Sequence, residues 1–310
     1  MTEQRPVWDA NVLARVRHLH LQARYYAAAA LQGEHRSRRV GQAVEFAGYQ
    51  EYQPGMDLRG LDWRVYGRTD RLVVKQFETE TELPCTILLD LSGDLGTGEV
   101  GRDGRPDLAT GKASYGIVLA ATLAYYLHLH GEPVGLEIVA GEGVAHRSLP
   151  ARGGRTHVQQ IFLQLAAARP SGRADLLPAI KRVGHRTRRR SWIGLITDGM
   201  EEPSRWLPAL GAFARRGADL RLFHLYDRRE WSMAFDAPAL FFSPEGGDAL
   251  PVDPAGAAGA FREVVREYVG EVRGGVLRYG GRYLPLPTDL PMERVMRAAI
   301  LDRPMRVELP

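Results

Sequence analysis

The sequence predicts an α/β protein built on a mainly parallel sheet that is flanked by helices. The first reason is the segment 86–94, where an apolar run passes directly into an acidic turn with the sequence Asp-Leu-Ser-Gly-Asp. Continuous apolar runs of this kind are typical of strands buried on both faces of a parallel sheet. The second reason is a long apolar helix expected over 112–130, because strand, polar turn and buried helix form half of a βαβ unit.

The composition is that of an ordinary globular protein. The chain has 310 residues, of which 45% are hydrophobic and 25% charged, and its formal net charge of +4 is small for this length. We therefore expect no nucleic-acid partner. The single cysteine, Cys85, fits a reducing compartment. No apolar run is long enough to predict a membrane span, so we expect a cytoplasmic protein.

Three regions follow one another along the chain. The segment 1–33 contains an amphipathic helix, expected over 7–32 and ended by Gly33. The segment 34–82 is rich in Arg, Asp and aromatic residues, and its alternating run at 68–77 predicts a strand. Because it has few aliphatic residues, we expect it to pack on the main domain, 83–305. Its charged residues would form an ion-pair network: Glu45, Asp57, Arg59, Asp62 and Arg68.

The main domain shows alternating strand and helix patterns. Strands are expected at 85–89, 133–140, 191–197, 219–226 and 283–286, with an edge strand at 143–149 and a small β excursion at 235–242 and 250–253. Helices are expected at 112–130, 156–168, 175–188, 204–216, 255–279 and 291–300.

Acidic residues follow two of these strands. Asp90, Ser92 and Asp94 end the first strand, and Asp198 ends the strand at 191–197. In open α/β sheets ligands bind at the carboxyl ends of strands, where the strand order reverses. Three carboxylates gathered there would suit a hard cation such as Mg²⁺. The alternative is that the two aspartates cap a turn and a helix, and that Arg173 neutralises the cluster.

A series of uncommon residues runs through the segment before the first strand. It comprises Gly33-Glu34-His35-Arg36-Ser37, Gly41, Glu45-Phe46, Tyr52, Pro54-Gly55, Asp57, Arg59, Asp62-Trp63, Arg68-Thr69 and Val74-Lys75-Gln76-Phe77-Glu78. In this order it resembles the signature of the domain of unknown function 58 family. The resemblance implies a bacterial protein with a Rossmann-like sheet, similar to von Willebrand factor A domains. It also implies a partner, because members often occur beside MoxR-type AAA+ ATPases.

The resemblance extends to the metal site of von Willebrand factor A domains. That site uses an Asp-x-Ser-x-Ser loop, a distant Thr and a later Asp. Here Asp94 stands in place of the second Ser, Ala174 in place of the Thr, and Asp198 matches the later Asp. The resemblance therefore implies a degenerate metal site at Asp90, Ser92, Asp94 and Asp198, which would bind Mg²⁺ or another divalent cation weakly.

Sequence motifs of catalysis are missing. The chain has no phosphate-binding Gly-rich loop followed by Lys-Ser, no pair of His or Cys at zinc-ligand spacing and no nucleophile elbow. We therefore predict a non-enzymatic protein-binding module, an adaptor or co-chaperone working with a MoxR-type AAA+ ATPase. The alternative is a metal-dependent hydrolase that uses Asp90, Asp94 and Asp198.

Overall fold

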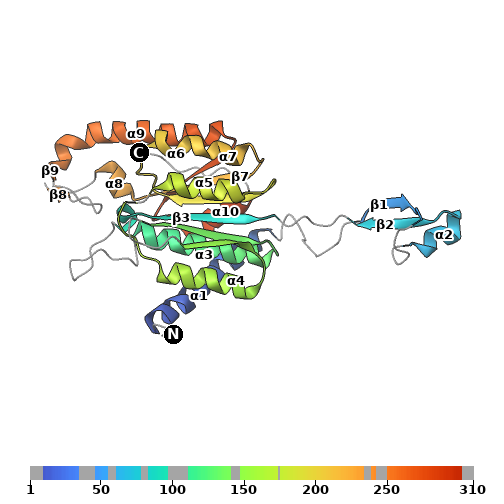
Figure 1. Cartoon of the computed structure of the whole chain (residues 1–310). Helices are drawn as coiled ribbons and strands as arrows, with labels where there is room; N and C mark the ends of the chain where they lie inside the picture. The colour runs from blue at the N-terminus through green and yellow to red at the C-terminus, as the bar shows by residue number, and fades with distance from the viewer. Residues whose placement is uncertain are drawn as a thin grey trace, which may run out of the picture. The chain divides into compact units, whose positions relative to one another are not determined.

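A computed structural model describes residues 10–34, 46–54, 61–77, 83–96, 111–140, 147–173, 175–233, 239–241 and 250–301. The chain divides into two compact units (Figure 1). The large unit combines Met1–Glu34 with Leu83–Pro310, and the small unit is His35–Glu82. The N-terminal helix therefore belongs to the large unit, although the small unit separates the two in sequence.

The large unit is built on a six-stranded sheet with the order β10-β7-β6-β3-β4-β5. Its strands are β3 (Cys85–Leu91), β4 (Val134–Ala140), β5 (Arg147–Arg152), β6 (Trp192–Thr197), β7 (Asp219–Tyr226) and β10 (Arg282–Pro287). All neighbours are parallel except β4 and β5. The chain moves from β3 toward β4 on one side and from β6 toward β7 on the other, so the strand order reverses between β3 and β6. The predicted fold class is confirmed.

Helices cover both faces of this sheet (Figure 1). One face carries α1 (Ala10–Glu34), α3 (Lys112–Leu129), α4 (Arg155–Ala167) and α10 (Met292–Leu301), and the other carries α5 (Leu176–Arg186) and α9 (Pro254–Arg278). Successive side chains of a strand point to opposite faces. Leu88 and Leu89 of β3 therefore belong to different cores, and both are fully buried. This two-sided burial explains the continuous apolar run from which the strand was predicted.

The helix predicted over 204–216 is instead three short pieces. They are α6 (Pro203–Trp206), a 3-10 turn η3 (Leu207–Leu210) and α7 (Gly211–Ala214). Pro208 interrupts a regular helix because it has no N–H to donate and its ring crowds the preceding turn. Trp206 is nevertheless fully buried, so the broken segment still covers the sheet. The predicted β excursion is confirmed as the antiparallel pair β8 (Ala239–Phe241) and β9 (Leu250–Val252).

The small unit contains a hairpin and a helix. Strands β1 (Phe46–Glu51) and β2 (Val73–Phe77) pair antiparallel, and α2 (Trp63–Thr69) lies between them in sequence. Asp62 caps α2, since its Oδ1 accepts a hydrogen bond of 2.9 Å from the Arg64 N–H. Its other carboxylate oxygen accepts the Tyr49 hydroxyl at 3.1 Å. The sequence analysis missed α2, because seven residues are too few to display a helical period.

The docking of the small unit on the large one stays a prediction. Three members of the expected ion-pair network, Glu45, Asp57 and Arg59, lie outside the described residues. The loop between β3 and α3, over 97–110, lies outside them as well.

The packing of α3 on the sheet generates the first testable prediction. A Cβ added to Gly116 would lie 3.0 Å from Leu225 Cδ1 and 3.3 Å from Leu89 Cδ1. We expect Gly116→Val to lower the free energy of unfolding by about 1–3 kcal/mol through overpacking. Urea denaturation measures this, with Gly270→Val in α9 as the control, because nothing lies within 4 Å of a Cβ there. Equal effects of both substitutions would contradict the packing described.

Candidate functional site

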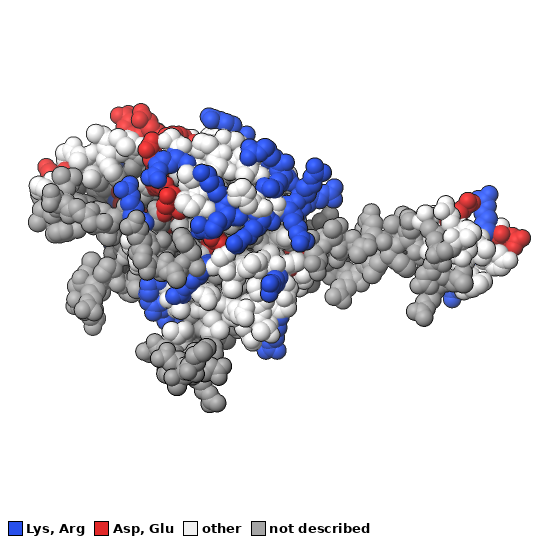
Figure 2. All heavy atoms as spheres, viewed as in Figure 1, with Lys and Arg blue, Asp and Glu red and all other residues white. Residues whose placement is uncertain are grey.

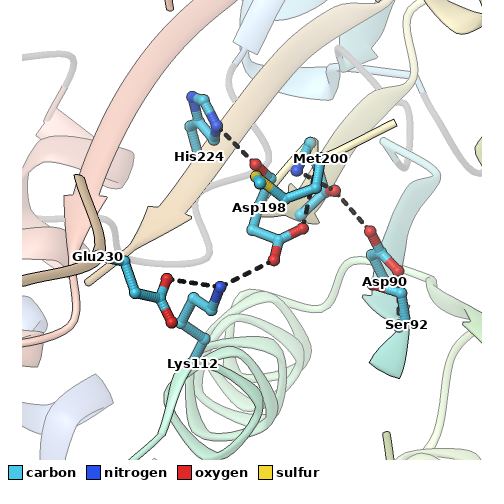
Figure 3. Close-up of polar contacts among 9 residues, drawn as sticks. Asp90, Ser92, Lys112, Asp198, Met200, His224 and Glu230 are labelled. Carbon is cyan, nitrogen blue, oxygen red and sulfur yellow. Dashed lines mark hydrogen bonds and ion pairs between the residues drawn. The ribbon is translucent and has the colours of Figure 1, made fainter. Parts of the chain in front are cut away.

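Two aspartates lie where the two central strands end. Asp90 is the last residue but one of β3, and Asp198 directly follows β6. Because β3 and β6 are parallel neighbours, both residues lie at the carboxyl edge where the strand order reverses, as predicted (Figure 3). Both are buried, with 3% and 2% of their surfaces exposed. The sheet thus places two carboxyl groups in surroundings that penalise charge.

Asp90 is held by hydrogen bonds to both of its carboxyl oxygens. Oδ1 accepts from the Ser92 N–H at 2.9 Å, and Oδ2 accepts from Thr197 Oγ1 at 2.6 Å. Thr197 Oγ1 in turn accepts from the Gly199 N–H at 2.8 Å. Burial, followed by the charge of Asp198, raises the pKa of Asp90 to about 7, while the bonds from Thr197 and Ser92 oppose the shift.

Asp198 is paired with a buried lysine. Lys112, the first residue of α3, places its Nζ 3.1 Å from Asp198 Oδ2 and 2.8 Å from Glu230 Oε2 (Figure 3). Burial lowers the pKa of Lys112, but the charges of Asp198 and Glu230 outweigh burial and raise it above its usual value. The ammonium group therefore stays charged and bridges the two carboxylates.

The position of Lys112 in its helix is unfavourable by itself. A cation in the first turn opposes the helix macrodipole, at a cost of about 0.3–1 kcal/mol. The carboxylates that offset this cost come from the end of β6 and from α8 (Arg228–Ser232). Next to Glu230, Trp231 stacks on Tyr226 with ring centroids 3.8 Å apart. This aromatic contact holds α8, and with it the Glu230 carboxylate that binds Lys112, against the end of β7.

A neutral histidine binds the backbone carbonyl of Asp198. His224 of β7 is fully buried, and its Nε2 lies 2.8 Å from the Asp198 carbonyl oxygen. A carbonyl only accepts, so Nε2 carries the proton and Nδ1 accepts from the Tyr283 hydroxyl at 2.6 Å. Burial lowers the pKa of His224 to about 4. Gly199 has φ +65°, and a Cβ there would lie 3.0 Å from the Tyr268 hydroxyl oxygen, so the position favours glycine.

The predicted site residues line one small cavity. Its volume is about 30 Å³, and its lining includes Asp90, Ser92, Asp94, Asp198 and Arg173. Such a volume holds about one or two water molecules. Asp94 lies on the 3-10 turn η2 (Gly93–Gly96) and is half-buried. Burial and then the charge of Asp198 raise the pKa of Asp94, against the opposing charges of Lys112 and Arg173.

The fit of these residues to a divalent ion can be judged from their contacts. Asp198, the expected ligand from β6, already binds the ammonium of Lys112. Within the described ranges, no group of three or more His, Cys, Asp or Glu side chains is arranged to hold a metal ion. As arranged, the Asp198 carboxylate is therefore occupied by an ammonium group and does not fit an ion. Metal binding at Asp90, Ser92, Asp94 and Asp198 stays a prediction, and Ala174 lies outside the described residues.

Four residues that complete this site were not predicted from the sequence. Lys112, Thr197 and His224 contact the two aspartates, and Glu230 contacts Lys112. A signal for Lys112 exists, since only three lysines occur among 41 basic residues, and this one begins an apolar helix. The alternative interpretation expected an arginine, Arg173, to neutralise the acidic cluster. In the structure a basic residue does pair with Asp198, but it is Lys112.

The lysine bridge generates a testable prediction about stability and metal binding. Lys112→Ala leaves Asp198 buried without its cation, so we expect the free energy of unfolding to fall by about 3–5 kcal/mol. Mg²⁺ or Mn²⁺ should restore part of this loss, because an ion that binds only the folded state stabilises it. Thermal shift with and without each ion measures both effects. Wild type and the control Lys181→Ala should not respond, and an equal response of all three proteins would contradict the argument.

The raised pKa of Asp90 generates a third testable prediction. A group that binds its proton more tightly when folded contributes stability below its unfolded pKa of about 3.9 and loses it as the pH rises toward its folded pKa of about 7. Asp90→Asn removes this loss, so we expect its stability relative to wild type to increase from about pH 5 to about pH 8. Urea denaturation across this range measures the difference in free energy of unfolding between the two proteins. Both contain His224, so its contribution to the pH dependence cancels in this difference. Asp289→Asn, on the surface, serves as the control, and a pH-independent difference for Asp90→Asn would contradict the assignment.

Solved structures with a similar fold have low sequence identity to this chain. The conserved hypothetical protein BatB from Bacteroides thetaiotaomicron has a TM-score of 0.46 and 14% identity, covering 71% of this chain and 98% of that chain. The SpRpn10 VWA domain has a TM-score of 0.37 and 10% identity, covering 70% and 94%. An aerotolerance-related membrane protein from Bacteroides fragilis has a TM-score of 0.44 and 14% identity, covering 70% and 96%. These likenesses concern the fold alone.

The predicted cytoplasmic location is contradicted by this comparison, because one of the similar structures is described as a membrane protein. The prediction rested on a single buried cysteine and on the lack of a long apolar run. Both features characterise the folded domain and not the compartment in which it works. In the described part of the chain, no helix combines the length and apolarity that a membrane span needs.

Sequence comparison identifies the family. An uncharacterized protein of Mycobacterium bovis, Mb1516, is 28% identical over 287 residues, which cover 91% of this chain and 86% of that protein. Residues 48–269 match the family described as "Protein of unknown function DUF58". Because this match covers more than half of the chain, the protein belongs to the DUF58 family.

Proposed function

We propose that the protein is a non-enzymatic adaptor that binds a MoxR-type AAA+ ATPase at the carboxyl edge of its sheet. The observation that carries the proposal is the buried Lys112, which neutralises Asp198 with a fixed side chain. The edge therefore has its charges satisfied within the chain. The identity of the ATPase comes from the family resemblance.

The same geometry weighs against the alternative, a metal-dependent hydrolase. A hydrolase of this class needs an open coordination position and space for its substrate beside the carboxylates. Here the cavity beside Asp90 and Asp198 is about 30 Å³, far below the roughly 300 Å³ of a small-ligand site. Asp198 is also already paired with a cation.

The rim of this edge suits contact with a protein. Met200 follows Asp198, lines the same cavity and is 60% exposed. Methionine is flexible and polarizable, and it is enriched in protein interfaces. Glu201 and Arg173 lie beside it in the cavity lining. A partner would therefore meet one apolar anchor surrounded by charges of both signs.

Binding to the ATPase tests this proposal. The protein and a MoxR-type ATPase from the same organism should co-purify, with an affinity that changes with the nucleotide state. Met200→Asp should weaken the complex about tenfold, the effect typical of losing an anchor residue. Leu277→Asp is the matched control, because Leu277 is an apolar residue on α9 that is 51% exposed, close to the 60% of Met200.

Two outcomes would overturn the proposal. The first is that no MoxR-type ATPase binds in any nucleotide state. The second is multiple-turnover hydrolysis by the purified chain with Mg²⁺ or Mn²⁺, which would favour the hydrolase.

A further inference from the structure

The large unit has a groove away from the carboxyl edge of the sheet, and the proposed function does not involve it. Helices α1, α3 and α4 enclose a groove of about 570 Å³. Its floor is aromatic, since His20 lies 5.3 Å from both Tyr125 and Phe162, measured between ring centroids. The groove is thus a built hollow between three helices.

The apolar surface continues from this floor onto the rim. Leu13 and Leu21 of α1 are 46% and 57% exposed, and Leu129 of α3 is 49% exposed. All three line the groove. A different face of α1 is buried in the core, through Leu19, Ala23, Ala27 and Ala30. The exposed leucines therefore do not serve the packing of α1 on the large unit.

The described residues around the groove carry charges of one sign. Arg17, Arg24 and Arg155 line it, together with His20 and His128, and its described lining residues include no Asp or Glu. None of the three arginines forms an ion pair with an acidic side chain of the described part of the chain. Over α4, blue and white atoms dominate the view in Figure 2. The rim is complementary to an acidic partner.

The exposed leucines and the arginines of α1 lie on the same face of the helix. Positions 13, 17 and 21 are four residues apart, so Leu13, Arg17 and Leu21 lie on one face of the helix, with Arg24 one turn further. An amphipathic helix recognised in a groove uses anchors at the same period. A partner helix with apolar anchors at this period and acidic residues beside them would match both the exposed leucines and the arginines of the rim.

We propose that the groove between α1, α3 and α4 binds an acidic amphipathic helix of a partner protein. The exposed leucines extend the apolar surface beyond the hollow, which favours a long partner over an enclosed small molecule. The concave shape favours a helix over the flat surface of an anionic membrane. The groove residues Tyr125 to Leu129 lie at the other end of α3 from Lys112, roughly 20 Å along the helix.

A synthetic peptide tests the proposal on the full chain. The probe is a labelled helix of about 20 residues, with Leu at the positions of one face and Glu at the others. Fluorescence anisotropy should show binding to the wild type that weakens with salt. Arg17→Glu with Arg24→Glu should lower the affinity about tenfold or more, since two attractions become repulsions.

The matched control reverses two arginines elsewhere. Arg188→Glu with Arg189→Glu changes the net charge equally on an exposed turn before β6 and should leave the affinity unchanged. Leu21→Ser should also weaken binding, and circular dichroism checks that each variant is folded.

Three outcomes would overturn the proposal: equal binding to wild type and to the Arg17/Arg24 variant, equal binding of a Leu/Lys peptide, or binding of phosphatidylserine vesicles without binding of the peptide. Binding of the ATPase through Met200 is a separate measurement, so either proposal can fail while the other stands.

Discussion

The carboxyl edge of the sheet depends on the pairing of Lys112 with Asp198. Strands β3 and β6 are buried on both faces, so the acidic residues at their ends lie where an unpaired charge costs several kcal/mol. The ammonium removes this cost for Asp198, and hydrogen bonds from Thr197 and Ser92 satisfy Asp90. The same pair fastens the start of α3 to the end of β6.

A lysine and a divalent ion solve the same electrostatic problem with different consequences. An ion can dissociate and can take an acidic group from a partner into its coordination shell. A lysine is part of the chain and cannot dissociate. Here the Lys112 ammonium already contacts a second carboxylate, that of Glu230. Recognition at this edge would therefore rest on side chains such as Met200, and it would be insensitive to the supply of metal ions.

Helix α3 connects the two surfaces that the large unit presents. Its first residue lies in the acidic site, and its last turns line the groove with α1 and α4. The edge is a nearly closed polar cluster with an exposed methionine, whereas the groove is an open apolar hollow with a basic rim. Such different chemistries suit different partners, which agrees with the proposed adaptor role.

The sequence by itself determined the α/β class, the strands of the six-stranded sheet and most of the long helices, and the placement of Asp90 and Asp198 at one edge. These features follow from local periodicity, because two-sided burial makes a strand continuously apolar and a helix repeats its apolar face every turn. Only the tertiary structure decided what neutralises the acidic residues. Lys112 lies 86 residues from Asp198 in sequence, and their contact arises because the packing of α3 brings its first turn over the end of β6. The exposure of Leu21 was likewise beyond the sequence, since a helical period shows which residues share a face but not whether a neighbour covers it.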